Sequence, residues 1–401
     1  MSTKPLQGIR VLDLSRILAG PWCSQQLADL GAEVIKIEKP AEGDDTRRWG
    51  PPWLEGGEAA YYLSANRGKQ SVTIDMAKPA GAGLIRELAQ HCDVVLENFK
   101  VGGLKKYGLD YESLKSLKPD LIYCSITGFG QTGPYAQRAG YDFMIQGMGG
   151  LMSLTGQPDS EGGEPVKVGV AFADIFTGLY AANAILAALL QRQQTGQGAY
   201  IDLALLDVQV GVLANQAANY LVSGQVPQRL GNAHPNIVPY QAFATQDGHL
   251  ILAVGNDAQF KRFCELANCP ELAEDERFMT NASRVKHRHT LIPLLLEPLK
   301  QRTTDEWLNA LEKVGVPCGP INTLDRVFAD PQVQARELVR NYPHPQAGQI
   351  QLVSNPVRIN GKAQNAPLPP PLLGQQTDNV LAQVLGLSAE QLVQLRQQTV
   401  I

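Results

Sequence analysis

The sequence predicts an α/β fold, with a Rossmann-like parallel sheet in a large domain and a smaller α+β domain. Short apolar runs alternate with helical patterns through the first half of the chain, which is typical of parallel strands joined by crossover helices. A Pro/Gly-rich stretch, GQVPQRLGNAHPNIVPY, then indicates a connection between domains. With 401 residues, 44% of them apolar, the chain has material for two cores.

The first elements are predicted to form a βαβ unit. GIRVLDLS has a strand pattern, a helix begins at Pro21 and ends at Gly31, and AEVIKIEKP has the next strand pattern. Further strand patterns are SVTIDM, DVVLENF and LIYCSITGFG, separated by helical segments near Ala80 to His91 and Tyr111 to Leu117. This order predicts a doubly wound parallel sheet, whose ligands bind at the carboxyl ends of the strands.

The remaining elements follow in order. The long apolar helix that contains Asp174 is succeeded by the strand pattern AYIDLALLD and a further helix. After the connection, QAFATQDGHLILAVG predicts a hairpin around Asp247-Gly248. Helices are predicted near Asp257 to Ala267 and Thr304 to Val314, and the chain ends with the strand pattern IQLVSNPVRI, a Pro-rich segment and two short helices.

Composition narrows the class of protein. The formal charge of -4 and the dispersed cations argue against a nucleic-acid partner, although local clusters suit a small polyanion. The six cysteines form no CxxC pair and have no nearby His at zinc-ligand spacing, so neither a disulfide framework nor a metal site is indicated. No secretory signal is visible, and the apolar stretch Leu179 to Leu190 is too short and mixed to span a bilayer. We expect a cytoplasmic protein with a buried core helix and no membrane partner.

Familiar nucleotide and hydrolase motifs are missing from the sequence. The first strand is followed by SRILAGPWCSQQLADLG and not by GxGxxG, so a dinucleotide site has little support. A P-loop, a GxSxG elbow and an HExxH pair are also missing. An acyl-serine hydrolase and a metal hydrolase are therefore not indicated.

Asp174 is the strongest nucleophile candidate in the sequence. It stands at the head of the long apolar helix, where free backbone N–H groups and the helix dipole are expected to keep a carboxylate ionised. Its small neighbours Gly169, Ala171, Ala173 and Gly178 leave room for another molecule. The alternative is an ordinary Asp N-cap, which contributes about 1 kcal/mol to the helix and nothing to chemistry.

Three loops at predicted strand ends carry cations that suit a polyanion. They are EKPAEGDDTRRWG with Lys39 and Arg47, ENFKVGGLKKYG with Lys100 and Lys106, and TGFGQTGPYAQRAGYD with Arg138. Each cation taken alone is more simply explained as solvated surface charge. Their convergence on one edge of the sheet favours the binding of a phosphorylated ligand.

Several separated segments occur in one order between about Pro5 and Leu373. They are GIRVLDLSRILAGPWCSQQLADLGAEVIKIEKPAEGDDTR, DVVLENFKVGGLKKYGLDYESL, YCSITGFGQTGPYAQRAGYD, VGVAFADIFTGLYAANAILAAL, GNAHPNIVPYQAF and GVPCGPINTLDRVFADPQVQAREL. Together they resemble the class III coenzyme A transferases, the CaiB/BaiF family that includes formyl-CoA and carnitine-CoA transferases. The combination is far more specific than any one motif.

The resemblance implies that Asp174 is the catalytic aspartate of a CoA-transferase. In this family the carboxylate attacks the donor thioester to give a mixed anhydride, the released thiolate converts it into an enzyme-CoA thioester, and the acceptor acid reverses these steps. CoA thioesters are then substrates, and no tightly bound cofactor is expected. The positions that the resemblance assigns to CoA binding are Ile17, Ala19, Lys39, Asn98, Phe99, Lys106, Arg138 and Tyr141.

Two departures from the formyl-CoA transferases bear on the choice of acids. Leu18 stands where they carry a glutamine, and GNAHPNIVPY lies near the place of their tetraglycine loop, so formyl-CoA and oxalate are poorer choices. GDDTRRWGPPW, YCSITGFGQTGPYAQRAGYD, GNAHPNIVPYQAF and PPPLLGQ look most like the succinate-hydroxymethylglutarate (glutarate) CoA-transferase branch. We expect succinyl-CoA as donor and a dicarboxylate such as glutarate as acceptor, with Leu18, Arg47 and His234 as candidate substrate residues. A structural turn histidine before Pro235 is an equally good interpretation of His234.

Two alternatives to a transferase stay open. The 2-methylacyl-CoA racemases of the same superfamily pair the aspartate with a histidine, where this chain has Tyr141. A phenol with an unperturbed pKa of about 10 is a poor base at neutral pH, which favours the transferase. The second alternative is a non-catalytic CoA-binding paralogue, which the presence of Asp174 disfavours.

The family architecture implies an interlocked homodimer, in which each subunit is a ring threaded through the other. The large domain would then be discontinuous. We assign residues 1–224 to its N-terminal part, 225–330 to the small domain with its linker, and 331–401 to a C-terminal part that returns to the large domain.

Overall fold

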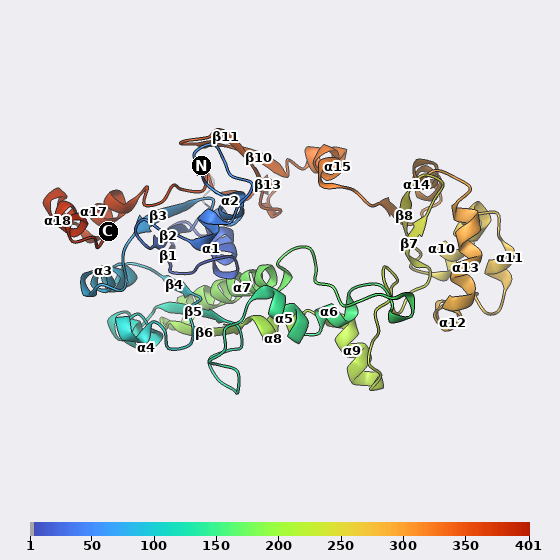
Figure 1. Ribbon diagram of the computed structural model, residues 1–401, viewed down its shortest axis with the longest axis horizontal. Helices are drawn as coiled ribbons and strands as arrows, with labels where there is room; N and C mark the ends of the chain where they lie inside the picture. Colours follow the sequence, from blue (N-terminus) through green and yellow to red (C-terminus); the bar gives the residue numbers. More distant parts are fainter. Residues whose placement is uncertain (1–3) are drawn as a thin grey trace. The chain divides into compact units, whose positions relative to one another are not determined.

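A six-stranded parallel sheet is the centre of the fold. The computed structural model describes residues 4–401, and its main sheet has the order β3-β2-β1-β4-β5-β6. The strands are β1 (Arg10–Asp13), β2 (Glu33–Glu38), β3 (Lys69–Thr73), β4 (Val94–Glu97), β5 (Ile122–Thr127) and β6 (Ala199–Ala204). This is the strand order of a doubly wound Rossmann sheet, so the predicted α/β fold is confirmed (Figure 1).

Helices α1 (Ala19–Asp29) and α7 (Phe172–Thr195) pack on one face of the sheet. Side chains of alternate strand residues point to this face, including Val11 and Ile122, and both are fully buried. Helices α1 and α7 pack against each other more extensively than any other pair of helices among the described residues. The start of each helix therefore has a defined position relative to the other.

Helices α3 (Pro79–Gln90), α4 (Tyr111–Leu117) and α17 (Thr377–Leu385) pack on the opposite face (Figure 1). The intervening strand residues, such as Leu12 and Val95, point to this layer and are fully buried. Burial on both faces explains why these strands have nearly continuous apolar sequences. Leu392 of α18 (Ala389–Gln397) belongs to the same buried cluster, so both short C-terminal helices complete the layer formed by the first half of the chain.

Helix α7 contains the apolar stretch that the sequence singles out. It has 24 residues with a mean hydropathy of 1.6, and among residues 4–401 it alone is long and apolar enough to cross a membrane by length and composition. The stretch is therefore longer than the sequence suggested. Its Ala181, Ile185 and Leu189 are buried against the sheet and α1, as in the core helix that the sequence predicts.

The chain forms two compact units. The first contains the residues up to Leu151, Lys167–Ser223 and Gln332–Ile401, and the second contains Met152–Val166 and Gly224–Pro331. The segment 152–166 thus differs from the predicted range 1–224, which gave it to the large domain. Its backbone pairs with the second unit, where the N–H of Gly231 donates to the carbonyl of Gly156 at 3.0 Å.

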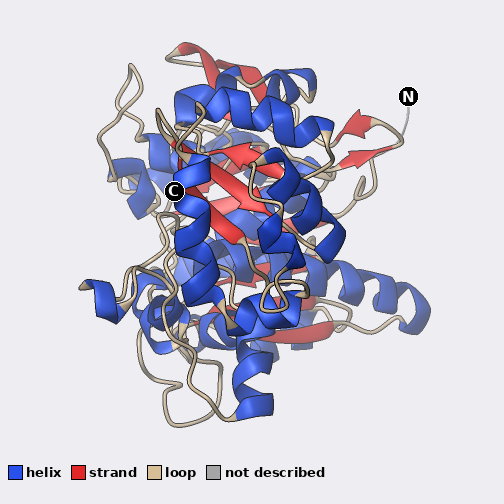
Figure 2. Cartoon of the chain, turned by 90° about the vertical axis from the view of Figure 1, so that its right-hand side faces the viewer, coloured by secondary structure: helices blue, strands red, loops and turns tan. Residues whose placement is uncertain are grey.

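The second unit has its own α+β core. Strands β7 and β8 form the predicted hairpin around Asp247-Gly248, and β9 extends it to a three-stranded antiparallel sheet. Phe243, Phe260 and Trp307 are buried between this sheet and its helices. The predicted smaller α+β domain is confirmed, and the combination of helices and short strands is visible in Figure 2. The elements are η3 (Asp159–Glu161), β7 (Tyr240–Ala244), β8 (His249–Ala253), α10 (Asp257–Leu266), α11 (Glu271–Glu274), α12 (Asn281–Lys286), α13 (Arg288–Leu299), α14 (Thr304–Lys313), β9 (Cys318–Pro320) and α15 (Leu324–Ala329).

The remaining elements belong to the first unit, except that α6 and α16 each cross a boundary between the two units. They are η1 (Asp45–Arg48), α2 (Ala60–Leu63), η2 (Lys105–Tyr107), α5 (Asp142–Met148), α6 (Leu151–Leu154), α8 (Leu205–Gly211), α9 (Ala214–Ser223), α16 (Pro331–Ala335), β10 (Val339–His344), β11 (Gly348–Val353), β12 (Arg358–Ile359), β13 (Lys362–Ala363) and α18 (Ala389–Gln397).

Candidate active site

Two adjoining cavities lie where the strand order of the main sheet reverses, at the carboxyl ends of β1 and β4. The first, which we call the Asp174 cavity, has a volume of about 500 Å³. The second, the Lys39 cavity, has a volume of about 540 Å³. Arg16, Asp45, Phe99 and Lys100 line both cavities, so the two cavities are neighbours that share a wall.

Asp174 is the third residue of α7, because the N-cap residue is Ala171. The N-cap interpretation of Asp174 is therefore wrong, since Ala171 occupies the N-cap position. Burial, followed by the charge of Asp142, raises the pKa of Asp174 to about 7. A pKa near 7 differs from the expectation that the helix terminus keeps Asp174 fully ionised at neutral pH.

Asp142, the first residue of α5, explains why Asp174 is unpaired. Its Oδ1 accepts hydrogen bonds from the backbone N–H groups of Ala173 at 2.8 Å and of Asp174 at 3.3 Å. Its Oδ2 accepts from Gln146 Nε2 at 2.7 Å, and Gln146 Oε1 accepts from the backbone N–H of Val168 at 2.9 Å. Asp142 therefore takes the N–H groups that the sequence assigned to Asp174. Sequence reasoning missed this role because the capped helix is distant along the chain.

The loop after β1 forms one wall of the Asp174 cavity through Ile17, Leu18 and Ala19. The side chain of Asn98 holds this loop, since its Oδ1 accepts from the backbone N–H of Arg16 at 2.8 Å and its Nδ2 donates to the Arg16 carbonyl at 2.7 Å. Ile17 has a left-handed backbone with φ of 70°. The structure thus brings these predicted residues together, with the amide of Asn98 already engaged by the protein.

The predicted cations divide between the two cavities. Lys39 and Lys106 line the Lys39 cavity, whereas Arg138 and Tyr141 line the Asp174 cavity. Tyr141 is 68% exposed and so remains available to a ligand. The guanidinium of Arg138 lies 4.6 Å from the ring centre of Tyr135, which supports its position at the cavity edge.

Arg47 is part of the protein core and not of an open acceptor site. It is 6% exposed, its Nε and Nη2 donate to Glu38 at 2.8 and 2.7 Å, and its Nη1 pairs with Glu58. Its guanidinium also lies 3.7 Å from the ring centre of Tyr62. The prediction that Arg47 holds a substrate carboxylate is therefore wrong, because two buried carboxylates already neutralise it.

His234 belongs to the second unit, in the loop before β7. Its backbone N–H donates to the carbonyl of Tyr240 at 2.9 Å, and its Nδ1 accepts from the backbone N–H of Asn236 at 3.0 Å. Burial, followed by the charge of Arg288, lowers the pKa of His234. The imidazole is then neutral near pH 7 with its proton on Nε2, and its role toward an acceptor stays a prediction.

Sequence reasoning also missed Glu97 and Tyr61. Glu97 accepts a hydrogen bond from the backbone N–H of Phe99 at 2.7 Å, and burial raises the pKa of Glu97 to about 7. The ring of Tyr61 packs edge-on against Trp49, which lines the Asp174 cavity. Burial, followed by the charges of Asp174 and Asp142, raises the pKa of Tyr61 to about 12, so its phenol is a hydrogen-bond donor at neutral pH. The sequence gives no signal for the raised pKa values, because they follow from burial and, for Tyr61, from carboxylates that are distant along the chain.

Within residues 4–401, no group of three or more His, Cys, Asp or Glu side chains is placed to hold a metal ion, and all six cysteines are free thiols. The Asp174 carboxyl group lines a cavity next to one lined by Lys39 and Lys106.

Comparison with known proteins agrees with this chemistry. The profile of CoA-transferase family III matches residues 6–377. The chain belongs to this family. It is 53% identical over 386 residues to the succinate–glutarate CoA-transferase of Agrobacterium fabrum, covering 95% of this chain and 96% of that protein. It is 48% identical over 382 residues to the human succinyl-CoA:glutarate CoA-transferase, covering 95% of this chain and 86% of that one.

Solved structures show the same fold. A CaiB/BaiF family protein from Brucella suis superposes with a TM-score of 0.84 at 54% identity, covering 96% of this chain and 100% of that one. Rv3272 from M. tuberculosis superposes with a TM-score of 0.83 at 32% identity, covering 94% and 99%. The family-III chain is thus an enzyme with transferase activity, and the predicted family is confirmed. These named relatives favour a transferase over both the racemase and the non-catalytic alternatives.

Proposed function

We propose that the enzyme transfers CoA from succinyl-CoA to glutarate, or to a similar dicarboxylate, through covalent intermediates on Asp174. The observation that carries this proposal is the unpaired Asp174 carboxylate, which lines a cavity next to a second, lysine-lined cavity. The acid pair is supported by the names of the relatives from Agrobacterium fabrum and human.

In this proposal, each of the two cavities binds a different part of the CoA thioester. The phosphorylated nucleotide binds in the Lys39 cavity, where Lys39 and Lys106 supply charge-assisted hydrogen bonds. The thiol arm passes Phe99, which lines both cavities, and brings the thioester to Asp174. Tyr141, exposed at the cavity wall, is then a contact for the arm.

Asp174 carries the acyl and CoA groups in turn. Its deprotonated oxygen attacks the thioester carbonyl, the C–S bond breaks, and CoA thiolate leaves a succinyl-aspartyl anhydride. The thiolate then attacks the aspartyl carbonyl, which releases succinate and leaves an aspartyl-CoA thioester. Glutarate attacks this thioester to give a glutaryl-aspartyl anhydride, and the thiolate attacks the glutaryl carbonyl to give glutaryl-CoA and free Asp174. Anhydride and thioester both keep the transferred group activated, which a serine ester would not.

We also propose that the active enzyme is a homodimer. Helix α9 leaves the apolar side chains of Leu221 and Val222 79% and 89% exposed, and a second subunit would cover them. The interlocking of the two subunits and the cytoplasmic location remain predictions.

Trapping of the covalent intermediate tests the role of Asp174. Incubation with succinyl-CoA and hydroxylamine should convert Asp174 to its hydroxamate and inactivate the enzyme, and peptide mass spectrometry would locate the change. The variant Asp174→Asn should not be modified at this position. Asp207→Asn is its matched control and should be trapped like the wild type, since Asp207 is also the third residue of a helix but is exposed on α8. An unmodified Asp174 peptide with activity retained would overturn the proposed mechanism.

A panel of acids tests the substrates. With succinyl-CoA as donor, glutarate should exceed monocarboxylates such as carnitine or cinnamate in kcat/KM. A monocarboxylate faster by tenfold, about 1.4 kcal/mol in transition-state binding, would reject the acid pair but keep the CoA-transferase assignment.

A further inference from the structure

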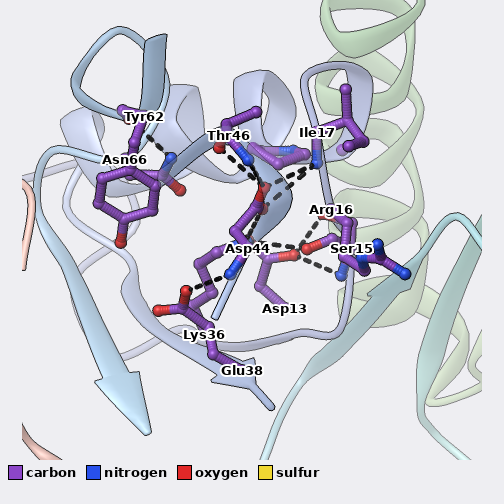
Figure 3. Close-up of polar contacts among 12 residues, drawn as sticks. Asp13, Ser15, Arg16, Ile17, Lys36, Glu38, Asp44, Thr46, Tyr62 and Asn66 are labelled. Carbon is purple, nitrogen blue, oxygen red and sulfur yellow. Dashed lines mark hydrogen bonds and ion pairs between the residues drawn. The ribbon is translucent and has the colours of Figure 1, made fainter. Parts of the chain in front are cut away.

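A buried carboxylate, Asp44, connects the loop after β2 to the loop that lines the Asp174 cavity. Asp44 is 1% exposed and accepts a hydrogen bond from Lys36 Nζ at 2.9 Å, and the Lys36 side chain is fully buried. It also accepts from the N–H and Oγ1 of Thr46 at 3.0 and 2.7 Å. Both Asp44 oxygens lie 3.3 Å from the backbone nitrogen of Ile17 (Figure 3). None of these contacts has a role in the covalent chemistry derived above.

Ile17 needs such a contact because its backbone conformation is unfavourable. Its φ of 70° lies in the left-handed region, which β-branched residues rarely adopt. Glycine accepts this conformation without a steric cost, but here a branched side chain occupies it. The Asp44 carboxylate holds the N–H of Ile17 in place and so maintains the strained turn.

Charged and amide side chains hold the residues before Ile17 in the same way. The N–H of Ser15 donates to Asp13, and its carbonyl accepts from Lys36 Nζ at 2.8 Å. The N–H and carbonyl of Arg16 both bond to Asn98. The backbone from Ser15 to Ile17 is therefore fixed by buried or partly buried side chains from three strand ends, as Figure 3 shows in part.

This segment leads directly into the start of α1, which faces the first turns of α7. A Cβ added to Gly178 of α7 would lie 2.6 Å from the carbonyl oxygen of Ala19, so the two backbones are in close contact. Ile17, Leu18 and Ala19 share a cavity with Asp174. A displacement of the Ser15–Ile17 backbone would consequently move the wall against which the reacting thioester lies.

We propose that Asp44 is a positioning residue for CoA transfer: ion-paired to Lys36, it holds the Ile17 turn so that the cavity wall faces Asp174 in the reactive geometry. This inference rests on the proposed function, because it takes Asp174 as the reacting group. Although burial opposes ionisation, the charge of Lys36 and the hydrogen bonds of Thr46 lower the pKa of Asp44 to about 2. The pair thus stays charged throughout the pH range of the assay.

Asp44→Asn tests the proposal, since it preserves side-chain size but removes the charge. With saturating succinyl-CoA, the rate of hydroxylamine trapping at Asp174 should fall about 10²-fold, the size of effect that a misplacement of about 1 Å produces. Asp29→Asn is the matched control: Asp29 is a fully buried carboxylate paired with Arg67 at 2.9 Å, and it lines neither cavity. It should lower the melting temperature and leave the trapping rate of the folded protein within about threefold.

Rescue separates positioning from general support of the fold. Ile17→Gly removes the steric cost of the left-handed turn, so adding it to Asp44→Asn should recover a substantial part of the trapping rate, in a double-mutant cycle with positive coupling. If Asp44→Asn does not fold, Lys36→Met with Asp44→Asn removes the unpaired buried ammonium, and it is compared with Lys36→Met alone, because both then lack the bond from Lys36 to the Ser15 carbonyl. An Asp44 variant that traps as fast as the wild type would overturn the positioning role. A wild-type enzyme that is not trapped at all would instead reject the proposed function.

Discussion

The replacement Asp174→Asn is expected to stabilise the protein while abolishing its activity. In the wild type, burial and the neighbouring Asp142 oppose ionisation of Asp174 and raise its pKa from 3.8 to about 7. Asn keeps the size of the side chain but never carries the charge. The cost of holding an anion at this position is therefore removed in the variant.

The stability gained by Asp174→Asn depends on pH. Because the folded-state pKa is raised, the folded protein retains a proton that the unfolded chain has released, and wild-type stability falls as pH rises from about 4 to about 7. Between pH 5 and pH 7 this amounts to about 2.7 kcal/mol at 1.36 kcal/mol per pH unit. Asp174 lines the cavity, so water screening reduces the effect, and we expect about 1 to 2 kcal/mol.

Urea unfolding at pH 5 and pH 8 measures this effect. The stability advantage of Asp174→Asn over the wild type should be larger at pH 8, whereas Asp207→Asn should show no such growth, because Asp207 is exposed. A variant that loses stability relative to the wild type on going from pH 5 to pH 8 would refute the reasoning. It would show that the head of α7 stabilises the carboxylate, as in the N-cap interpretation.

Three further predictions concern catalysis and binding. The kcat/KM of the wild type should fall about tenfold per pH unit below pH 7 as Asp174 takes up its proton, and a profile that is flat from pH 5 to 8 would contradict the assigned pKa. Lys39→Glu and Lys106→Glu should each raise KM for succinyl-CoA by about tenfold or more with little change in kcat. The control Lys362→Glu, on β13 and outside the lining of both cavities, should leave KM unchanged, and isothermal titration with CoA measures the binding directly. Arg47→Met should destabilise the fold by about 3 to 5 kcal/mol by leaving buried carboxylates unpaired, yet keep the preference for dicarboxylates in the folded fraction, and a selective loss of glutarate use would restore Arg47 to the acceptor site.

Local patterns in the sequence were sufficient for the order and type of the main elements. Strand-like apolar runs, Pro21 near a helix start and the Asp247-Gly248 turn each act over a few residues, and the structure confirms the elements that they predict. The carboxyl ends of β1 and β4 were also predictable as a binding edge, since parallel connectivity brings the loops that follow them together. For Asp174, the family motifs favoured a catalytic role over a helix cap, a choice that no local pattern decides.

Only the tertiary structure decided which charged groups meet. Arg47 and Lys39 come from one loop. Arg47 is buried in ion pairs with Glu38 and Glu58, whereas Lys39 lines a cavity. In the same way, Asp142 occupies the N–H groups at the head of α7 and leaves Asp174 unpaired.

The membership of residues 152–166 in the second unit and the hold of Asp44 on Ile17 are likewise contacts between distant parts of the chain. Periodicity and turn residues reflect the conformational preferences of short segments, and so the sequence determined the secondary-structure elements. Its ordered motifs determined the family. The ionisation and orientation of a side chain depend on the charges and burial around it, which exist only after the segments have packed.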